Sequence, residues 1–125
     1  MKIESNKIGG ALGRVYDSAI NELIFGKDPQ DHADAYAGRH DFPFAEIEFA
    51  GKYLDTCVRV AVTDNDEDRA AKAFLDAKTV VRSVIMNQRE DGYIGGLRDG
   101  CEKEWFSVWN QAFTMIGLCS YAAAF

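Results

Sequence analysis

DGYIGG, at residues 91–96, is a glycine-rich turn between two long helical patterns. The carboxylate of Asp91 can accept a hydrogen bond from a backbone amide two residues on, and Gly92 can adopt the positive φ that such turns often need. Tyr93 adds a large amphipathic side chain, which fits either the rim of a pocket or an anchor of the loop on the core. The turn therefore predicts one helix before it and another after it.

The two helical patterns around this turn are read from the spacing of their apolar residues. One runs from Glu67 to about Gln88, and the other begins at about Glu104. In the first, a shared face carries Ala70, Phe74, Ala77, Val81, Val84, Ile85 and Gln88, with Lys72, Asp76 and Arg82 largely opposite. In the second, one side carries Trp105, Trp109, Ala112, Phe113, Ile116 and Ser120. Spacings of three and four residues predict amphipathic helices.

Further helices are expected upstream. Pro43 suits the first turn of a helix that runs to about Val62, because its missing N–H would have no helical partner there. The expected buried residues of this helix are Ile47, Ala50, Leu54, Val58, Ala61 and Val62. Residues 64–66, Asp-Asn-Asp, supply turn formers and capping side chains for the next helix. Residues 11–25 form another amphipathic pattern that Gly26 ends, and residues 31–37 are either a short helix or a loop.

No stretch alternates between apolar and polar residues with a period of two, so the expected fold is all-α. The interruptions after Val62 and Gln88 are short enough to make neighbouring helices antiparallel. We therefore expect residues 1–125 to form a single all-α domain of antiparallel helical hairpins that follow an N-terminal helix.

Composition and charge exclude several classes of function. The chain has 125 residues, of which 47% are hydrophobic, and a net charge of -6. This charge offers no positive surface for nucleic acid or an anionic membrane. Cys57, Cys101 and Cys119 are odd in number and fit no zinc pattern, so we expect reduced thiols. Without a secretory core or an apolar run of about 18 residues, the sequence predicts a soluble, cytoplasmic protein. Its apolar helical end indicates a truncated chain or a terminal helix docked on the core.

Aromatic and amide side chains near the end of the chain are the best candidates for ligand contact. Trp105 and Trp109 lie one helical turn apart and can stack on a sugar ring, although the continuing apolar stripe favours a place in the core. Trp109 is the better ligand candidate because polar Asn110 and Gln111 follow it. Their amides can both donate to and accept from neutral hydroxyls, or they can face solvent or a neighbouring helix.

Charged and imidazole groups give weaker signals. Glu48 and Lys52 have the spacing of a surface salt bridge, which contributes about 0.3–0.5 kcal/mol. His32 and His40 lie in an acidic segment without the spacing of a helical metal-ligand pair, so solvated histidines are the favoured interpretation. The sequence therefore predicts neither a metal site nor a catalytic residue.

Three segments taken together resemble glycoside hydrolase family 127, which contains β-L-arabinofuranosidases. They are EFAGKYL at residues 48–54, QREDGYIG at residues 88–95, and residues 105–121, with WNQ at 109–111 and Gly-Leu at 117–118. The resemblance runs from about Gly10 to the last residue and corresponds to the N-terminal part of much longer proteins. It implies a partial (α/α)6 toroid of the six-hairpin glycosidase superfamily.

The resemblance also implies part of a sugar-binding wall. Its residues would be Glu48, Lys52, Tyr93, Trp109, Asn110 and Gln111. Many relatives carry Gly-His where this chain has Asn110 and Gln111. The family's cysteine nucleophile, zinc, further cysteines and glutamate belong to the later part of the toroid and map to no residue here. The resemblance therefore implies a chain with carbohydrate as its partner, no cofactor of its own and no catalysis alone.

A different class of function remains open beside this one. An incomplete toroid leaves helix faces uncovered, and such faces usually become interfaces. The alternative is therefore a small helical interaction module that forms a homo-oligomer or binds the missing remainder of the toroid. A stand-alone sugar-binding module is a third alternative.

Overall fold

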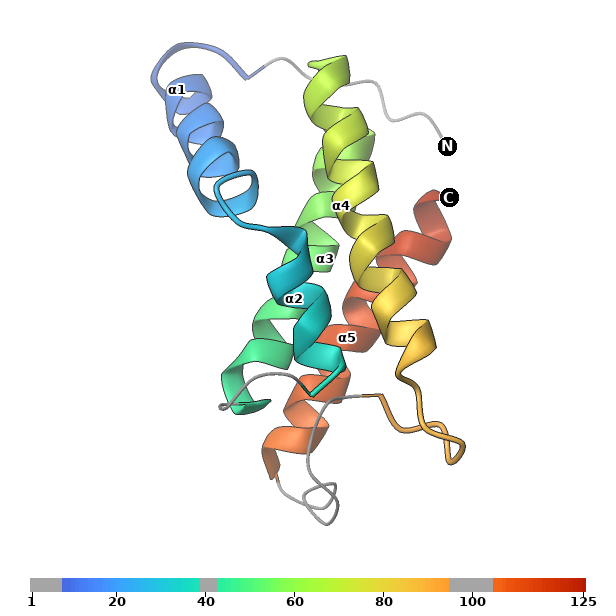
Figure 1. Cartoon of the computed structure of the whole chain (residues 1–125). Coiled ribbons are helices and arrows are strands. Elements are labelled where there is room, and N and C mark those ends of the chain that lie inside the picture. The colour runs from blue at the N-terminus through green and yellow to red at the C-terminus, as the bar shows by residue number, and fades with distance from the viewer. Residues whose placement is uncertain (1–7, 39–42, 95–104) are drawn as a thin grey trace.

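The computed structural model describes residues 8–38, 43–94 and 105–125, and this part of the chain contains helices and no strand (Figure 1). The all-α prediction is thus confirmed. The predicted helix boundaries agree with the structure to within two residues, and residues 31–36 belong to a helix that ends at Tyr36. The elements are α1 (Gly10–Ala19), the π-helix η1 (Ile20–Ile24), α2 (Pro29–Tyr36), α3 (Pro43–Thr63), α4 (Glu67–Met86) and α5 (Trp105–Ala124).

Capping side chains start two of these helices, α4 at the predicted Asp66 and α2 at Asp28. The carboxylate of Asp66 accepts hydrogen bonds from two amides of the first turn of α4, at 3.1 and 3.0 Å. Asp28 accepts a hydrogen bond from the amide of Gln30, at 2.9 Å, and Pro29 occupies the first position of α2. These groups satisfy amides that have no partner within their own helix.

The turn after α4 has the predicted chemistry. The amide of Tyr93 donates to the carboxylate of Asp91 at 3.1 Å, and Gly92 has a φ of +87°. The backbone of Arg89 pairs with Tyr93 at 3.0 Å and with Gly92 at 2.9 Å. Gly95 and Gly96 lie outside the described residues, as do His40, Cys101 and Glu104.

Helix α3 is the centre of the bundle: α5 packs on it, α4 packs antiparallel to it, and α2 lies against α3 and α4 (Figure 1). The predicted α3–α4 hairpin is therefore confirmed. Helix α5 runs antiparallel to α4, as the short interruption predicts, but it packs mainly on α3, to which it runs parallel. Gly51 meets Phe113, and Asp55, one turn further along α3, accepts a hydrogen bond from Ser120, one to two turns further along α5.

The core lies between these helices. The buried α3 residues include four of those predicted, whereas Ala61 and Val62 are only half-buried. The largest part of the core is formed by Tyr36, Ile47, Ala50, Leu54, Cys57, Val58, Ala77, Val80, Val81 and Val84.

Two glycines let α3 and α5 approach each other closely. A Cβ atom added to Gly51 would lie 2.6 Å from the carbonyl carbon of Phe113, and one added to Gly117 would lie 2.9 Å from the carbonyl oxygen of Gly51. Both distances are shorter than real Cβ contacts, so only residues without a side chain fit here. The two backbones therefore touch at this crossing.

This close crossing decides which face of α5 is buried, and the face differs from the sequence prediction. Ser107, Asn110, Thr114 and Gly117 point inward and are buried, whereas Trp109, Ala112 and Ile116 of the predicted stripe are exposed. The reason is steric: small and medium polar residues fit between touching backbones, and bulky apolar residues do not.

The buried face of α4 also differs in detail from the prediction. Asp76, expected opposite the apolar face, is buried and accepts hydrogen bonds from Tyr53 at 3.2 Å and Lys72 at 2.7 Å. Ile85 and Gln88, expected on that face, are exposed. A buried carboxylate is tolerated here because two donors satisfy it.

Helix α1 stands apart from the bundle and contacts mainly η1 (Figure 1). Its tether to the rest is polar. The hydroxyl of Tyr16 donates to Asp64 at 3.2 Å, and Arg69 pairs with Asp17 at 2.7 Å and with Asp64 at 3.0 Å. The apolar stripe of this segment, predicted from its spacing, remains largely exposed at Leu12, Val15 and Leu23.

Candidate functional site

Three of the six predicted site residues lie together on an exposed surface where α3 meets α5. Lys52 forms a salt bridge with Glu48, as the spacing predicts, and its ammonium nitrogen lies 4.4 Å from the ring centre of Phe113. Trp109 meets Phe113 edge to face, with ring centres 5.3 Å apart, and is 50% exposed. We call Glu48, Lys52, Trp109 and Phe113 the aromatic platform. It presents apolar rings beside a pair of opposite charges.

Tyr93 and Gln111 are also close together, but they hold the chain rather than face a cavity. The hydroxyl of Tyr93 is hydrogen-bonded to that of Ser107 at 3.0 Å, and the amide of Gln111 donates to the carbonyl of Ile94. Both bonds connect the segment after α4 to α5. The structure thus favours the anchoring role that the sequence left open for Tyr93.

Asn110 lies on the inward face of α5, away from the aromatic platform. It is 1% exposed, and neither polar atom of its side chain has a hydrogen-bond partner among the described residues. The backbone carbonyl of Asn110 accepts a hydrogen bond from the hydroxyl of Thr114 at 2.9 Å, and this hydroxyl is also hydrogen-bonded to that of Tyr36 at 3.0 Å. A buried amide without partners costs about 1–3 kcal/mol, so this position is a local weakness of the core. The side chain has no access to a ligand on the platform.

The outward face of α5 is apolar throughout. No Asp, Glu, Lys or Arg occurs between Trp105 and Ala124, a signal that the sequence alone contains. What the sequence does not reveal is that the bulky residues face outward, because the glycine crossing decides the orientation. We call the exposed residues the α5 outer face: Val108, Trp109, Ala112, Met115, Ile116, Cys119, Ala122 and Ala123.

A buried polar group around Tyr53 and Asp76 has the residue types of a catalytic site without the required chemistry. Cys57 is completely buried beside Tyr53, and burial raises the pKa of its thiol to about 12. Burial likewise raises the pKa of Tyr53, which donates to Asp76. A thiol that stays protonated at neutral pH is a poor nucleophile, so Cys57 is a core residue.

An open groove of about 940 Å³ lies between η1 and α3, with α2 at one end. We call it the η1 groove. Ile20, Leu23 and Ile24 form one wall, and Phe49 and Tyr53 line the α3 side. The imidazole of His32 stacks on Tyr53 with ring centres 4.0 Å apart. Sequence spacing does not predict this groove, because it depends on how far α1 and η1 stand from α3.

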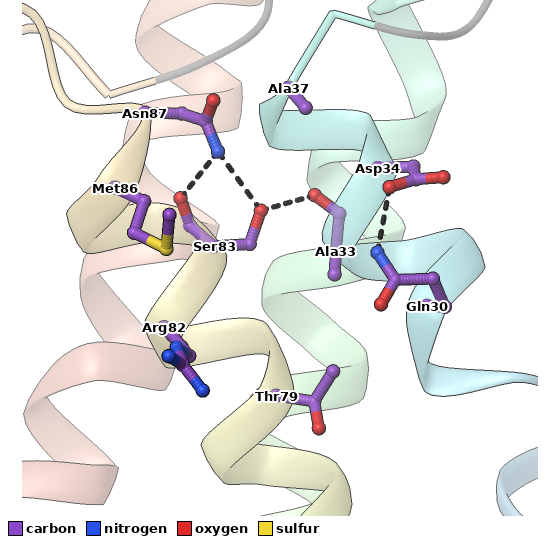
Figure 2. A pocket seen from close by; sticks show the side chains of 9 residues that line it. All are labelled: Gln30, Ala33, Asp34, Ala37, Thr79, Arg82, Ser83, Met86 and Asn87. Carbon is purple, nitrogen blue, oxygen red and sulfur yellow. Dashed lines mark hydrogen bonds between the residues drawn. The ribbon is translucent and has the colours of Figure 1, made fainter.

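A second hollow, of about 450 Å³, lies between α2 and α4 and is lined mainly by polar side chains, together with two alanines and Met86 (Figure 2). The hydroxyl of Ser83 donates to the carbonyl of Ala33 at 2.6 Å, and the amide of Asn87 donates to both oxygens of Ser83 at 2.8 and 3.2 Å. Gln30 donates to Asp34 at 2.7 Å on the facing helix. Of these bonds, the one from Ser83 to Ala33 joins α4 to α2, and the others lie within a single helix.

Comparison of the chain with protein-family models, with curated proteins and with solved structures found no match. Within the described residues, no group of three or more His, Cys, Asp or Glu side chains is placed to hold a metal ion. None of the helices described has the length and apolar content needed to cross a membrane.

Proposed function

We propose that the chain is a helical interaction module that associates with a second copy of itself through the α5 outer face. The observation that supports this proposal most strongly is a twenty-residue helix without a charged residue that exposes Val108, Met115 and Ile116 to solvent. Isolated apolar residues on a surface are ordinary, whereas a contiguous apolar face marks an interaction site.

Electrostatics favours the α5 outer face as the surface through which two copies meet. The chain has a net charge of -6, so two copies repel each other through most approaches. The α5 outer face carries no charge and is therefore the face on which two copies meet without opposing like charges. A two-fold interface places the same surface on both sides, and an uncharged apolar face is complementary to itself.

The size of this face limits the strength of the dimer. A helix of twenty residues is about 30 Å long and about 11 Å wide, so two such faces bury on the order of 700 Å² in total. Stable interfaces typically bury at least about 1,200 Å². The smaller area here predicts a weak dimer whose dissociation constant is micromolar or higher.

Sedimentation equilibrium from about 1 to 500 μM tests the proposal with a matched pair of variants. Ile116 lies on the α5 outer face and Ile85 is exposed on α4, so Ile116→Glu and Ile85→Glu make the same chemical change at different faces. We expect wild type and Ile85→Glu to approach twice the chain mass of 13.9 kDa, and Ile116→Glu to stay at that mass. A wild-type chain of 13.9 kDa at every concentration, or equal dissociation by both variants, rejects the proposal.

A second candidate function is carbohydrate binding at the aromatic platform, as part of a toroid related to glycoside hydrolase family 127. The exposed ring of Trp109 supports it, because an apolar sugar face stacks on such a ring while Lys52 and Glu48 are placed to bond hydroxyls. Tyr93, Asn110 and Gln111 take no part in the site in this proposal.

Tryptophan fluorescence of the Ile116→Glu variant, titrated with arabinose-containing oligosaccharides, tests this second function without competition from the dimer. We expect a saturable change that Trp109→Phe removes and Lys52→Met weakens. Ile85→Glu serves as the matched surface control. If the fluorescence of the Ile116→Glu variant, with Trp109 intact, does not change with any glycan of a broad panel, the carbohydrate proposal is rejected.

A further inference from the structure

We propose that the η1 groove binds a linear aliphatic carboxylate of medium chain length, such as a ten- to twelve-carbon fatty acid. This site is separate from the α5 outer face, which carries the proposed self-association. The groove residues of α1, η1 and α2 belong to neither the α5 outer face nor the aromatic platform; only Lys52, at the groove edge, belongs to both groove and platform.

The groove has the size and walls of a small-molecule site. Its volume of about 940 Å³ falls at the upper end of the range common for ligand pockets, roughly 300–1,000 Å³. The side chain of Leu23 is 65% exposed although it faces this apolar hollow, and Phe49 opposite is 56% exposed. An aliphatic chain that lies between these two side chains removes both from water, and the burial of this apolar surface favours binding.

The backbone of the groove wall is itself unusual. Residues Ile20–Ile24 form a π-helix, in which the amide of Phe25 donates to the carbonyl of Ile20 at 3.0 Å. Single π-turns within α-helices occur frequently at functional sites. Here the widened turn holds Ile20 and Ile24 against the core and leaves Leu23 facing the groove.

On the opposite side of the groove, Tyr53 is held in place by neighbouring side chains. Tyr53 is stacked on His32, and its hydroxyl is held by Asp76, which Lys72 holds in turn at 2.7 Å. Groups fixed in this way lose little conformational entropy on binding. The groove thus offers a preformed apolar surface.

Charge at the edges selects the head group. Among the residues that line the groove are two lysines, Lys27 and Lys52, one imidazole and a single carboxylate, that of Asp31. Lys52 is already paired with Glu48, whereas Lys27 forms no ion pair with any described residue. An unpaired lysine beside an apolar groove can bond the carboxylate of a ligand and therefore favours an anionic head group over a cationic one.

Isothermal titration calorimetry of the full chain with decanoate, below its micelle concentration, tests the proposal. We expect saturable binding of one molecule per chain, with affinity rising about threefold to fourfold per added methylene from octanoate to dodecanoate. Decylammonium, with the same apolar chain and the opposite charge, should bind at least tenfold more weakly. Equal binding of decanoate and decylammonium overturns the charge argument and the proposal with it.

Two matched leucines locate the site. Leu23 faces the groove, whereas Leu12, also exposed, lies on α1 outside it. Leu23→Ser should weaken decanoate at least fivefold, Leu12→Ser should leave it unchanged, and Lys27→Met should remove most of the preference for decanoate over decylammonium. Equal loss from both leucine variants, or absence of saturable binding, overturns the proposal. Circular dichroism confirms that each variant is folded.

Discussion

Replacing Gly51 with alanine tests the closest contact in the bundle. The added Cβ would lie 2.6–2.7 Å from three backbone atoms of Phe113 and Thr114, and ordinary contact begins at 3.4 Å. Helix α5 must therefore move away from α3 by roughly 0.8 Å, because a backbone cannot change rotamer. A shift of that size removes a quarter to a half of the dispersion energy from contacts that it opens.

The expected loss follows from two opposing effects. Overpacking of this kind costs about 1–3 kcal/mol, the opened contacts add to it, and the better helix propensity of alanine returns up to about 1 kcal/mol. We expect Gly51→Ala to lower the free energy of unfolding by about 2–3 kcal/mol. For a domain of this size that corresponds to a fall in Tm of roughly 10 °C.

Urea unfolding followed by circular dichroism at 222 nm measures this loss, and two other glycines calibrate it. Gly117→Ala should cost less, because part of its contact is with the flexible side chain of Leu54, and Gly9→Ala should be nearly neutral, because nothing lies within 4 Å. A Gly51→Ala chain as stable as wild type, or one more stable than Gly117→Ala, would refute the crossing as the determinant of α5 orientation.

Three further measurements follow from buried groups and a cap. Burial raises the pKa of Tyr36 to about 12, so the stability that this group contributes is full below pH 10 and falls by about 3 kcal/mol as pH rises to 12. Tyr36→Phe should reduce the loss of stability in pH-dependent urea unfolding by about this amount, and Tyr53 and Cys57, whose pKa values are also raised, account for the slope that remains. In a Cys101→Ser background, a thiol reagent at neutral pH should label Cys119 rapidly and Cys57 only upon unfolding, and equal rates would contradict the burial of Cys57. Asp66→Ala should lower stability by about 1 kcal/mol in urea unfolding, whereas Asp66→Asn should lower it less.

Local signals in the sequence were sufficient for the helices. Pro43, Gly26 and the caps act within one turn of the chain, so they predict where helices begin and end. Asp91 and Gly92 likewise define their turn from two residues. The packing of α5 was not predictable in this way. It depends on contact between Gly51 and a residue 62 positions away, and this contact turns the bulky side of the helix outward.

The candidate sites also differ in whether they depend on contacts within one helix or on distances between helices. The Glu48–Lys52 pair is a neighbour interaction on one helix, and its spacing predicts it correctly. The burial of Asn110 and the formation of the η1 groove depend on distances between helices, which apolar periodicity does not contain. The proposed sugar-binding wall therefore keeps Trp109 beside this pair and loses the amides.

Helix α1 and the bundle are held by different interactions, so their stabilities respond differently to solution conditions. Arg69 holds Asp17, whose side chain is 54% exposed, while the bundle is held by buried apolar side chains. Added salt screens an exposed ion pair, and salts such as sulfate strengthen apolar burial. The same buffer change therefore loosens α1 and tightens the bundle. Amides of α1 should exchange with deuterium through a local opening long before those of α3, and ammonium sulfate should widen the difference.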